Sequence, residues 1–263
     1  MKFIAAMDHS GGSTGGVLER YGCEYTEENK MDLVHEMRLR MITSPDFNSN
    51  NIWAAILYKD SVERGAVDVL GNKGIEAILK IDSGCHMNGL LKDFEVDDMI
   101  DYALTKGCTG TKMRSIVKTP NILNAILDQQ FELATVIYNA GLMPIVEPEV
   151  PIEHEMKNML EEMLTRELYN RLDKFDGKCI LKLTLPDTPN LHHKLTQHPN
   201  VSKVVGLSGG YNTSEACSRL GLQDDMTASF SRALSEGLFV TQSEEEFNQR
   251  LSKNIKLITE ASE

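Results

Sequence analysis

Residues 178–186, KCILKLTLP, place five apolar side chains around Lys182. A strand that is apolar at neighbouring positions is covered on both of its faces, which is typical of parallel strands packed beneath helices. The segment therefore predicts a buried parallel strand. Lys182 lies in the middle of it, where a charged ammonium group without a partner would be costly because it loses its hydration. The rest of the sequence has to supply a reason for that lysine.

Similar apolar segments recur along the chain, and the sequence between them has a helical pattern. The segments are residues 2–7, 52–58, 75–81, 107–113, 142–148, 179–185, 201–207 and 227–233, of which the fourth and eighth are placed mainly by spacing. Strands alternating with helices predict a (β/α)8 TIM barrel, a fold that typically uses about 250 residues. An open doubly wound sheet is the alternative, but no GxGxxG follows the first segment. We expect α/β architecture and a single domain, residues 1–263.

Three of the intervening segments carry clear helical signals. They are residues 121–141, 154–172 and 243–258. The first two repeat apolar side chains at the spacing of an amphipathic helix, and Gly141 is a suitable residue to end the first. Ser243 is followed three residues later by Glu246, which predicts a capping box at the start of the third.

The bulk properties exclude several classes of protein. The net charge of −12 disfavours nucleic acid or an anionic membrane surface as a partner. No apolar run approaches the roughly 20 residues that span a bilayer, and the run after Lys2 is too short for a secretory signal. The five cysteines are scattered, which predicts reduced thiols and a cytoplasmic location.

Polar side chains stand where most of the predicted strands end, which is where a barrel builds its active site. They are Asp8, Lys80, Lys112, Arg114, Glu147, Glu149, Lys182, Ser208, Ser229, Ser231 and Arg232. Lys112 and Arg114 are two residues apart and therefore share a face of their strand. The same holds for Glu147 and Glu149. A negatively charged chain that gathers cations at one end is suited to bind an anion there.

The turns after two strands indicate that this anion is phosphate. HSGGST, residues 9–14, and LSGG, residues 207–210, are short Ser/Gly turns whose backbone N–H groups are able to bind a phosphate. Arg232 would add a bidentate contact to the second turn. The first turn offers Ser10 and Ser13, with Lys80 nearby, so the mouth suits a substrate phosphorylated at both ends.

The groups between these two turns are suited to covalent catalysis. A lysine in apolar surroundings with cationic neighbours favours the neutral amine, which attacks a carbonyl and forms a Schiff base. The resulting iminium accepts electrons from a breaking C–C bond. Such a reaction needs carboxylates as acid and base, and Asp8, Glu147 and Glu149 are available beside Lys182.

Plainer roles remain open for some of these residues. Arg232 precedes Glu236 by one helical turn, so the two pair if a helix starts early, and Lys80 is also explained as a charged strand end.

The histidines are not expected to take part in the chemistry. His192, His193 and His198 lack the spacing of a metal site, so we expect them on the surface and predict no bound metal. His9 follows Asp8 and is expected to point the other way.

Seven motifs occur in an order that resembles a known family. They are AAMDHSGGST, EMRLRMITSP, GTKMRS, PIVEPEV, LKLTLP, VVGLSGGY and SFSRAL. Together they resemble the class I fructose-1,6-bisphosphate aldolases, in particular the bacterial branch. The resemblance implies a (β/α)8 barrel that cleaves fructose 1,6-bisphosphate into dihydroxyacetone phosphate and glyceraldehyde 3-phosphate, in glycolysis or gluconeogenesis. It implies a covalent Schiff base on Lys182, with no metal or other cofactor.

The same resemblance implies a role for each motif residue. Lys182 is the Schiff-base lysine, and Glu147 is the acid and base of the carbinolamine step, supported by Glu149. Asp8 receives the proton of the substrate hydroxyl, and Lys112 polarises substrate oxygens. The phosphate contacts are implied for Lys80, Ser10 and Ser13 on the aldehyde side, and for Ser208, Gly209, Ser231 and Arg232 on the ketone side, with Arg114 beside Lys112.

Some features leave alternatives open. The chain ends in the 243–258 helix, without a counterpart of the terminal tyrosine of animal enzymes, so the group that handles the proton at the nucleophilic carbon is not identified. Ser231 replaces a glycine of the animal enzymes. A Schiff-base aldolase for another phosphorylated ketose, and a non-catalytic barrel scaffold, are the alternative functions. The sequence is also compatible with a homo-oligomer.

Overall fold

The computed structural model describes residues 1–10 and 12–263, without the side chains of residues 12 and 13. Its eight strands form one parallel sheet in the order of the chain. They are β1 (Phe3–Met7), β2 (Ile52–Leu57), β3 (Glu76–Lys80), β4 (Gly110–Ile116), β5 (Met143–Glu149), β6 (Cys179–Thr184), β7 (Val201–Leu207) and β8 (Met226–Ala228). The amide of Ala6 donates to the carbonyl of Phe230 at 3.1 Å, which joins β1 to the segment after β8. The predicted (β/α)8 barrel is confirmed.

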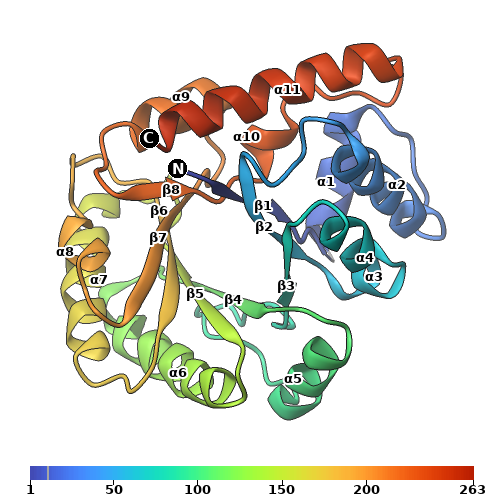
Figure 1. The fold of residues 1–263 in the computed structure, drawn as a ribbon. Coiled ribbons are helices and arrows are strands. Elements are labelled where there is room, and N and C mark those ends of the chain that lie inside the picture. The colour runs from blue at the N-terminus through green and yellow to red at the C-terminus, as the bar shows by residue number, and fades with distance from the viewer. Residues whose placement is uncertain (11) are drawn as a thin grey trace.

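Helices surround the strands on the outside of the barrel (Figure 1). They are α1 (Gly12–Tyr21), α2 (Lys30–Thr43), α3 (Lys59–Glu63), α4 (Ala66–Gly71), α5 (Val96–Thr105), α6 (Pro120–Asn139), α7 (Lys157–Leu172), α8 (His193–Thr196), α9 (Thr213–Leu220), α10 (Arg232–Ser235) and α11 (Glu244–Ala261). Gly141 follows α6 with a φ of +89°, the left-handed conformation that ends many helices. The predicted capping box of Ser243 and Glu246 is present at the start of α11.

Two predicted strands have different bounds in the structure. The fourth runs from Gly110 to Ile116 and not over 107–113, because Gly107 adopts a φ of +74° and ends the turn after α5. The eighth was expected over 227–233, but β8 ends at Ala228 and α10 begins at Arg232. Ser229, Ser231 and Arg232 therefore lie in the loop after β8 and at the start of α10, not on the strand.

The apolar core has an inner and an outer part, as the continuous apolar strands predicted. The inner part fills the barrel and consists of Ile4, Ala6, Ala54, Ile56, Ile78, Ile145, Ile180 and Val205. The outer part packs the strands against the helices and includes Leu181, Leu183 and Leu185 of β6. Because strand side chains alternate between faces, the residues two positions beyond Ile145 and Ile180 continue the inner surface. Those residues are Glu147 and Lys182.

The prediction that three histidines lie on the surface is wrong for two of them. His192 and His198 are buried, whereas His193 is exposed. The Nδ1 atom of His192 lies 2.9 Å from the hydroxyl of Thr165, and burial lowers the pKa of His192 to about 4. The helix α8 packs against β7 and α7, and His192 directly precedes it. Among the described residues, no group of three or more His, Cys, Asp or Glu side chains is placed to hold a metal.

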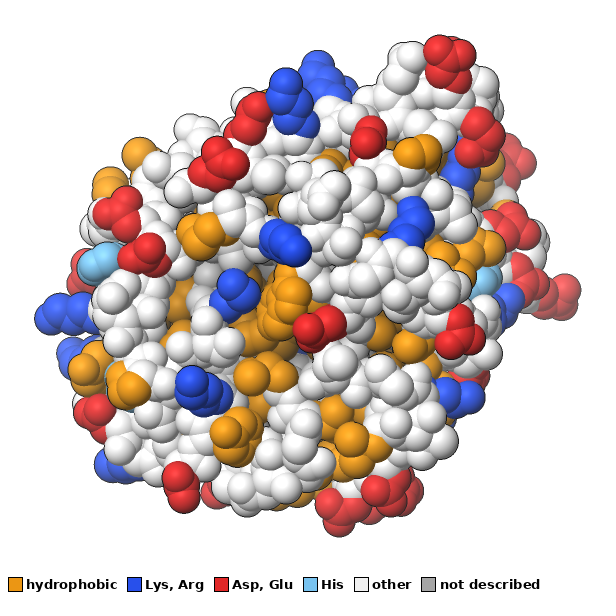
Figure 2. Space-filling view, in the orientation of Figure 1, with side chains coloured by type: hydrophobic (Ala, Val, Ile, Leu, Met, Phe, Trp, Pro, Cys, Tyr) orange, Lys and Arg blue, Asp and Glu red, His pale blue; other side chains and the backbone are white. Residues whose placement is uncertain are grey.

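The surface mixes charges of both signs. In the view of Figure 2, Lys and Arg side chains alternate with Asp and Glu around the rim, with hydrophobic side chains between them. None of the described helices has the length and apolar character needed to cross a membrane.

Replacing Ser243 by alanine removes the capping box and should destabilise the protein. The Ser243 hydroxyl accepts from the Glu246 amide at 3.2 Å, and the loss of such a cap typically costs about 1 kcal/mol. We expect urea denaturation to show a fall in the free energy of unfolding of this order. Ser252→Ala, inside the same helix, is the control, because alanine favours a helix interior. An equal loss in both variants would contradict the capping role.

Candidate active site

A line of four charged side chains from four strands crosses the mouth of the barrel. Lys112 Nζ lies 2.6 Å from Asp8 Oδ2 and 3.0 Å from Glu147 Oε2. The other oxygen of Glu147, Oε1, lies 3.1 Å from Nζ of Lys182. Asp8 follows β1, and the other three side chains belong to β4, β5 and β6. The structure thus brings together four of the five predicted catalytic residues in one chain of ion pairs.

The contacts of Lys182 explain why a lysine lies in a buried apolar strand. Lys182 is 4% exposed, and its neighbours in sequence face the outer core. Its own side chain points inward, where the Glu147 carboxylate compensates part of the cost of burying an amine. The apolar strand therefore places one buried amine beside one carboxylate.

The charges of this chain of ion pairs support one another. Burial by itself raises the pKa of Asp8, but the ammonium groups of Lys112 and Lys182 outweigh it and hold the pKa well below its usual range. Burial also lowers the pKa of Lys112, but Asp8 and Glu147 outweigh this effect and raise the pKa above its usual range. At neutral pH Asp8 is therefore ionised and Lys112 is charged.

The fifth predicted catalytic residue, Glu149, lies one layer higher and pairs with Arg114. Arg114 Nη1 is 3.0 Å from Glu149 Oε2, and the Arg114 side chain is 46% exposed at the rim. Burial, against the attraction of Arg114, raises the pKa of Glu149 above its usual value. Glu149 thus binds the proton more readily than an exposed glutamate does.

The residues predicted around the aldehyde-side phosphate meet beside this chain. Lys80 Nζ donates to the Ser10 hydroxyl at 3.1 Å and to the Asp82 carbonyl at 3.0 Å, and it lies 3.0 Å from Asp82 Oδ1. Asp82 is buried, and its other oxygen accepts from the amide of Arg114. Asp82 therefore ties β3 to β4 while it orients Lys80. The side chain of Ser13 lies outside the described part of the structure.

The residues predicted for the ketone-side phosphate come from two neighbouring loops. Arg232 Nη1 donates to the carbonyl of Gly210 at 3.3 Å, so the loops after β7 and β8 are joined. Gly209 has a φ of +57°, and a Cβ on it would lie 2.7 Å from Ile152, so only glycine fits there without movement. Ser208 is buried at the start of this loop.

Glu236 takes no part in holding Arg232. Its Oε2 accepts from the amide of Thr213 at 2.5 Å and also from the hydroxyl of Thr213. The plain explanation of Arg232 as a helical partner of Glu236 is therefore not the arrangement in the structure.

Comparison with known proteins identifies the family. The family model described as Fructose-bisphosphate aldolase class-I matches residues 1–176. The curated class 1 fructose-bisphosphate aldolase of Clostridium acetobutylicum is 45% identical, over 99% of this chain and 95% of its own. The curated class 1 enzyme of Synechocystis is 44% identical, over 99% of this chain and 93% of its own. The chain belongs to the class I fructose-bisphosphate aldolases.

Solved structures agree with this family on the fold. A fructose-bisphosphate aldolase from Plasmodium falciparum superposes with a TM-score of 0.80 at 18% identity, covering 99% of this chain and 90% of its own. An archaeal fructose 1,6-bisphosphate aldolase superposes with a TM-score of 0.63 at 11% identity, covering 98% and 94%. Class I aldolases use a Schiff-base lysine and no metal, as the sequence analysis expected for this chain.

Sequence reasoning assigned no role to Arg38, which supports the turn after β1 in this aldolase. Arg38 is buried in α2, and its guanidinium donates to the Ser61 hydroxyl at 2.9 Å and to the carbonyl of His9. The sequence does contain a signal for this role, because Arg38 falls on the apolar face of α2. The other buried residues of that face are Val34, Met37, Met41 and Ile42.

The contact of His9 was also not predicted. The Nε2 atom of His9 lies 2.5 Å from the Ser231 hydroxyl, so the turn after β1 touches the loop after β8. Burial, with a further effect of Arg38, lowers the pKa of His9 to about 4, so the ring is neutral at neutral pH. His9 therefore joins the two loops that the sequence had associated with separate phosphates.

Replacing Lys112 by methionine leaves the carboxylates of Asp8 and Glu147 buried without their shared cation. Removing one partner of a buried ion pair typically costs about 3–5 kcal/mol, and we expect a loss of this order in urea denaturation at neutral pH.

The loss should depend on pH. The wild-type protein gains stability from the low pKa of Asp8 above the pKa of an unfolded aspartate, and this contribution disappears as the pH falls through the folded-state pKa. In the variant Asp8 is buried without Lys112 and takes up a proton more readily. The deficit should therefore be largest at neutral pH and shrink towards about pH 4. Lys178→Met, at an exposed position, is the control, and a deficit independent of pH would contradict this electrostatic role.

Proposed function

We propose that this class I fructose-bisphosphate aldolase cleaves fructose 1,6-bisphosphate reversibly through an iminium formed on Lys182. The observation that carries the assignment of Lys182 is its 3.1 Å contact with Glu147 inside an otherwise apolar strand. We infer that residues 1–263 act as one catalytic domain in glycolysis or gluconeogenesis. The five free cysteines support a cytoplasmic location.

Formation of the iminium requires a nucleophile and an acid at hydrogen-bond distance from one another. Glu147, in contact with Lys182 Nζ, takes a proton from that nitrogen as it adds to the C2 carbonyl of the substrate and gives a carbinolamine. Glu147 then returns the proton to the carbinolamine hydroxyl, which leaves as water, and the iminium remains on Lys182. Glu149 lies one layer above Glu147, and burial is the main cause that raises its pKa. It is therefore proposed to supply a proton to Glu147. Lys112 holds the Glu147 carboxylate from the opposite side.

Cleavage of the C3–C4 bond requires a base for the hydroxyl on C4. Asp8 is ionised and takes that proton while the bonding electrons move into the iminium. Glyceraldehyde 3-phosphate leaves, and an enamine remains on Lys182. Protonation at C3 and hydrolysis of the iminium then release dihydroxyacetone phosphate and restore the free amine.

The two phosphate groups of the substrate fit the two loop clusters. Lys80 and Ser10, with Ser13, are proposed to bind the phosphate on the aldehyde side. On the ketone side we propose Ser208, Gly209, Ser231 and Arg232. Arg114, paired with Glu149 at the rim, is proposed as a further substrate contact. The small phosphorylated sugar is the partner that this arrangement supports, and assembly into a homo-oligomer is compatible with it.

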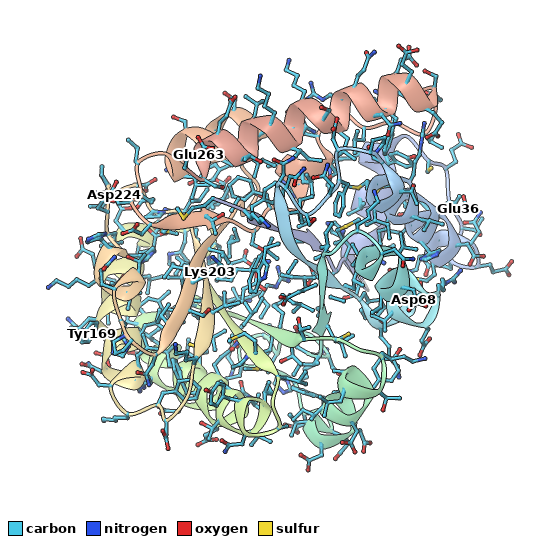
Figure 3. All side chains as sticks on the ribbon, viewed as in Figure 1. Glu36, Asp68, Tyr169, Lys203, Asp224 and Glu263 are labelled. Carbon is cyan, nitrogen blue, oxygen red and sulfur yellow. The ribbon has the colours of Figure 1, made fainter. Side chains whose placement is uncertain are left out.

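Trapping with borohydride tests the role of Lys182. The wild-type protein incubated with dihydroxyacetone phosphate and borohydride should gain a covalent adduct on the peptide that contains Lys182, and Lys182→Met should gain none. Lys203→Met is the matched control, because Lys203 lies near the start of β7, away from the strand ends that carry the site (Figure 3). Cleavage of fructose 1,6-bisphosphate should persist in EDTA. An adduct on another lysine, or activity lost with EDTA, would sink the proposal.

The same experiment separates the alternative substrate. A wild-type adduct on Lys182 together with no cleavage of fructose 1,6-bisphosphate would favour an aldolase for another phosphorylated ketose. Absence of any adduct and of any cleavage would favour the non-catalytic scaffold.

Replacing Arg232 by alanine should weaken binding of the ketone-side phosphate. Hydrogen bonds to charged groups typically contribute about 1.5–3 kcal/mol, so we expect roughly a 10- to 100-fold rise in KM for fructose 1,6-bisphosphate. The kcat at saturation should change less, because the phosphate is remote from the bond that breaks. Arg166→Ala, at an exposed arginine of α7, is the control. A fall in kcat with unchanged KM would contradict this assignment.

A further inference from the structure

The backbone pairing between β5 and β6 stops just before the catalytic pair. The two strands pair at Ile145↔Ile180 and Val146↔Leu181 over the described residues. By contrast, β4 and β5 pair up to Ile116↔Glu149, and β6 and β7 pair up to Thr184↔Leu207. Glu147 and Lys182 each directly follow the last residue of their strand that takes part in the pairing of β5 with β6. The backbone ladder therefore does not set the distance between these two side chains.

A side-chain hydroxyl joins the two strands again on the far side of the catalytic pair. Thr184 Oγ1 donates to the carbonyl of Val150 at 2.7 Å and accepts from the amide of Val150 at 3.0 Å. Both residues are buried, Thr184 to 1% exposure and Val150 to 0%. One hydroxyl thus satisfies the donor and the acceptor of a buried peptide unit, in the way that a paired strand residue would.

The geometry places Lys182 between two points of attachment. The inward-facing residues of β6 are Ile180, Lys182 and Thr184, because side chains alternate along a strand. Ile180 belongs to the paired part of the strand, and Thr184 carries the hydroxyl bridge. On β5 the same two points enclose Glu147. A shift of either strand at the bridge would change the separation of Lys182 Nζ and Glu147 Oε1.

The outer sides of both strands are also fixed. The amide of Val117 donates to the carbonyl of Glu149 at 2.8 Å, which holds the end of β5 to β4. The buried ammonium of Lys157 donates to the carbonyl of Leu185 at 3.0 Å, which holds the end of β6 to α7. With the outer contacts in place, the Thr184 hydroxyl is the contact that sets the width of the opening between β5 and β6 at this level.

We propose that Thr184 is a positioning residue for the carbinolamine step, and this inference rests on the proposed function of Lys182 and Glu147. Its hydroxyl holds β5 and β6 at the spacing that keeps Glu147 Oε1 within reach of the nitrogen and of the leaving hydroxyl. The same spacing is needed when the carbinolamine forms and when the iminium is hydrolysed. Thr184 touches neither the substrate nor the reacting atoms in this scheme.

Valine at position 184 has nearly the shape of threonine but lacks the hydroxyl. In Thr184→Val the buried amide and carbonyl of Val150 lose their partner, so the end of β5 has to move to find another. Misplacement of a catalytic group by about 1 Å is able to cost about 100-fold in rate. We therefore expect kcat for fructose 1,6-bisphosphate to fall roughly 10- to 100-fold, with KM changed by less than about threefold. Thr184→Ser keeps the hydroxyl and should restore most of kcat.

Thr111 supplies a matched control on the neighbouring part of the sheet. Thr111 in β4 is also completely buried, and its hydroxyl has no hydrogen-bond partner among the described residues. Thr111→Val therefore makes the same chemical change in the same barrel without removing a bridge. We expect it to leave kcat, and the rate of adduct formation, at the wild-type values.

The decisive readout is rapid-quench borohydride trapping with dihydroxyacetone phosphate as the probe. Thr184→Val should form the adduct on Lys182 more slowly by the same factor as its kcat falls, while Thr184→Ser and Thr111→Val follow the wild type. Wild-type trapping rates in Thr184→Val would overturn the inference. An equal fall of kcat in Thr184→Val and Thr184→Ser would also overturn it, and so would a rise of KM in Thr184→Val with kcat unchanged. A wild-type protein that forms no adduct on Lys182 would instead overturn the proposed function, so the two failures are distinguishable.

Discussion

The ammonium group of Lys112 holds two buried carboxylates from different strands, and the arrangement of the mouth depends on it. Without this cation, Asp8 and Glu147 would be neighbouring buried negative charges, which repel one another and take up protons. With it, Asp8 remains ionised, and one oxygen of Glu147 is left for Lys182. The desolvation of each group is compensated by the next group in the line, so the four charges are stable only together.

The barrel makes such a line possible because its inward-facing side chains change from apolar to charged along the strands. The lower inward positions are apolar and pack against one another, and the next positions on β1, β5 and β6 are Asp8, Glu147 and Lys182. The apolar layer below excludes water from the charged layer. Low polarity then strengthens each ion pair. Lys112, Glu147 and Lys182 lie on strands, and Asp8 directly follows one, so the scaffold itself holds the distances between them.

Contacts between neighbouring loops and strands hold the rim of the barrel mouth in place. Asp82 ties the end of β3 to β4, and Arg232 ties the loop after β8 to the loop after β7. His9 connects the turn after β1 to Ser231 and, through its carbonyl, to Arg38 of α2. Loops from opposite sides of the mouth are therefore in direct contact with one another. Thr184 performs the same linking function one layer lower, where the backbone ladder between β5 and β6 ends.

The sequence by itself determined the barrel and identified the charged residues that the structure brings together at its mouth. Segments that are apolar at consecutive positions, separated by helical patterns, indicated parallel strands covered on both faces. Charged residues such as Lys182 stood out because they interrupt these apolar segments. The sequence placed the eighth strand too far along the chain, because the alternation of polar and apolar residues continues through Ser229 and Phe230, past the point where β8 ends. It also placed His192 on the surface, although only contact with Thr165 of α7 decides that it is buried. Only the tertiary structure decided which charges pair, that Asp82, His9 and Arg38 support the mouth, and that Thr184 bridges two strands. These are contacts between residues far apart in the chain, and local propensity and periodicity carry no information about which distant groups the closed barrel brings to within 3 Å of one another.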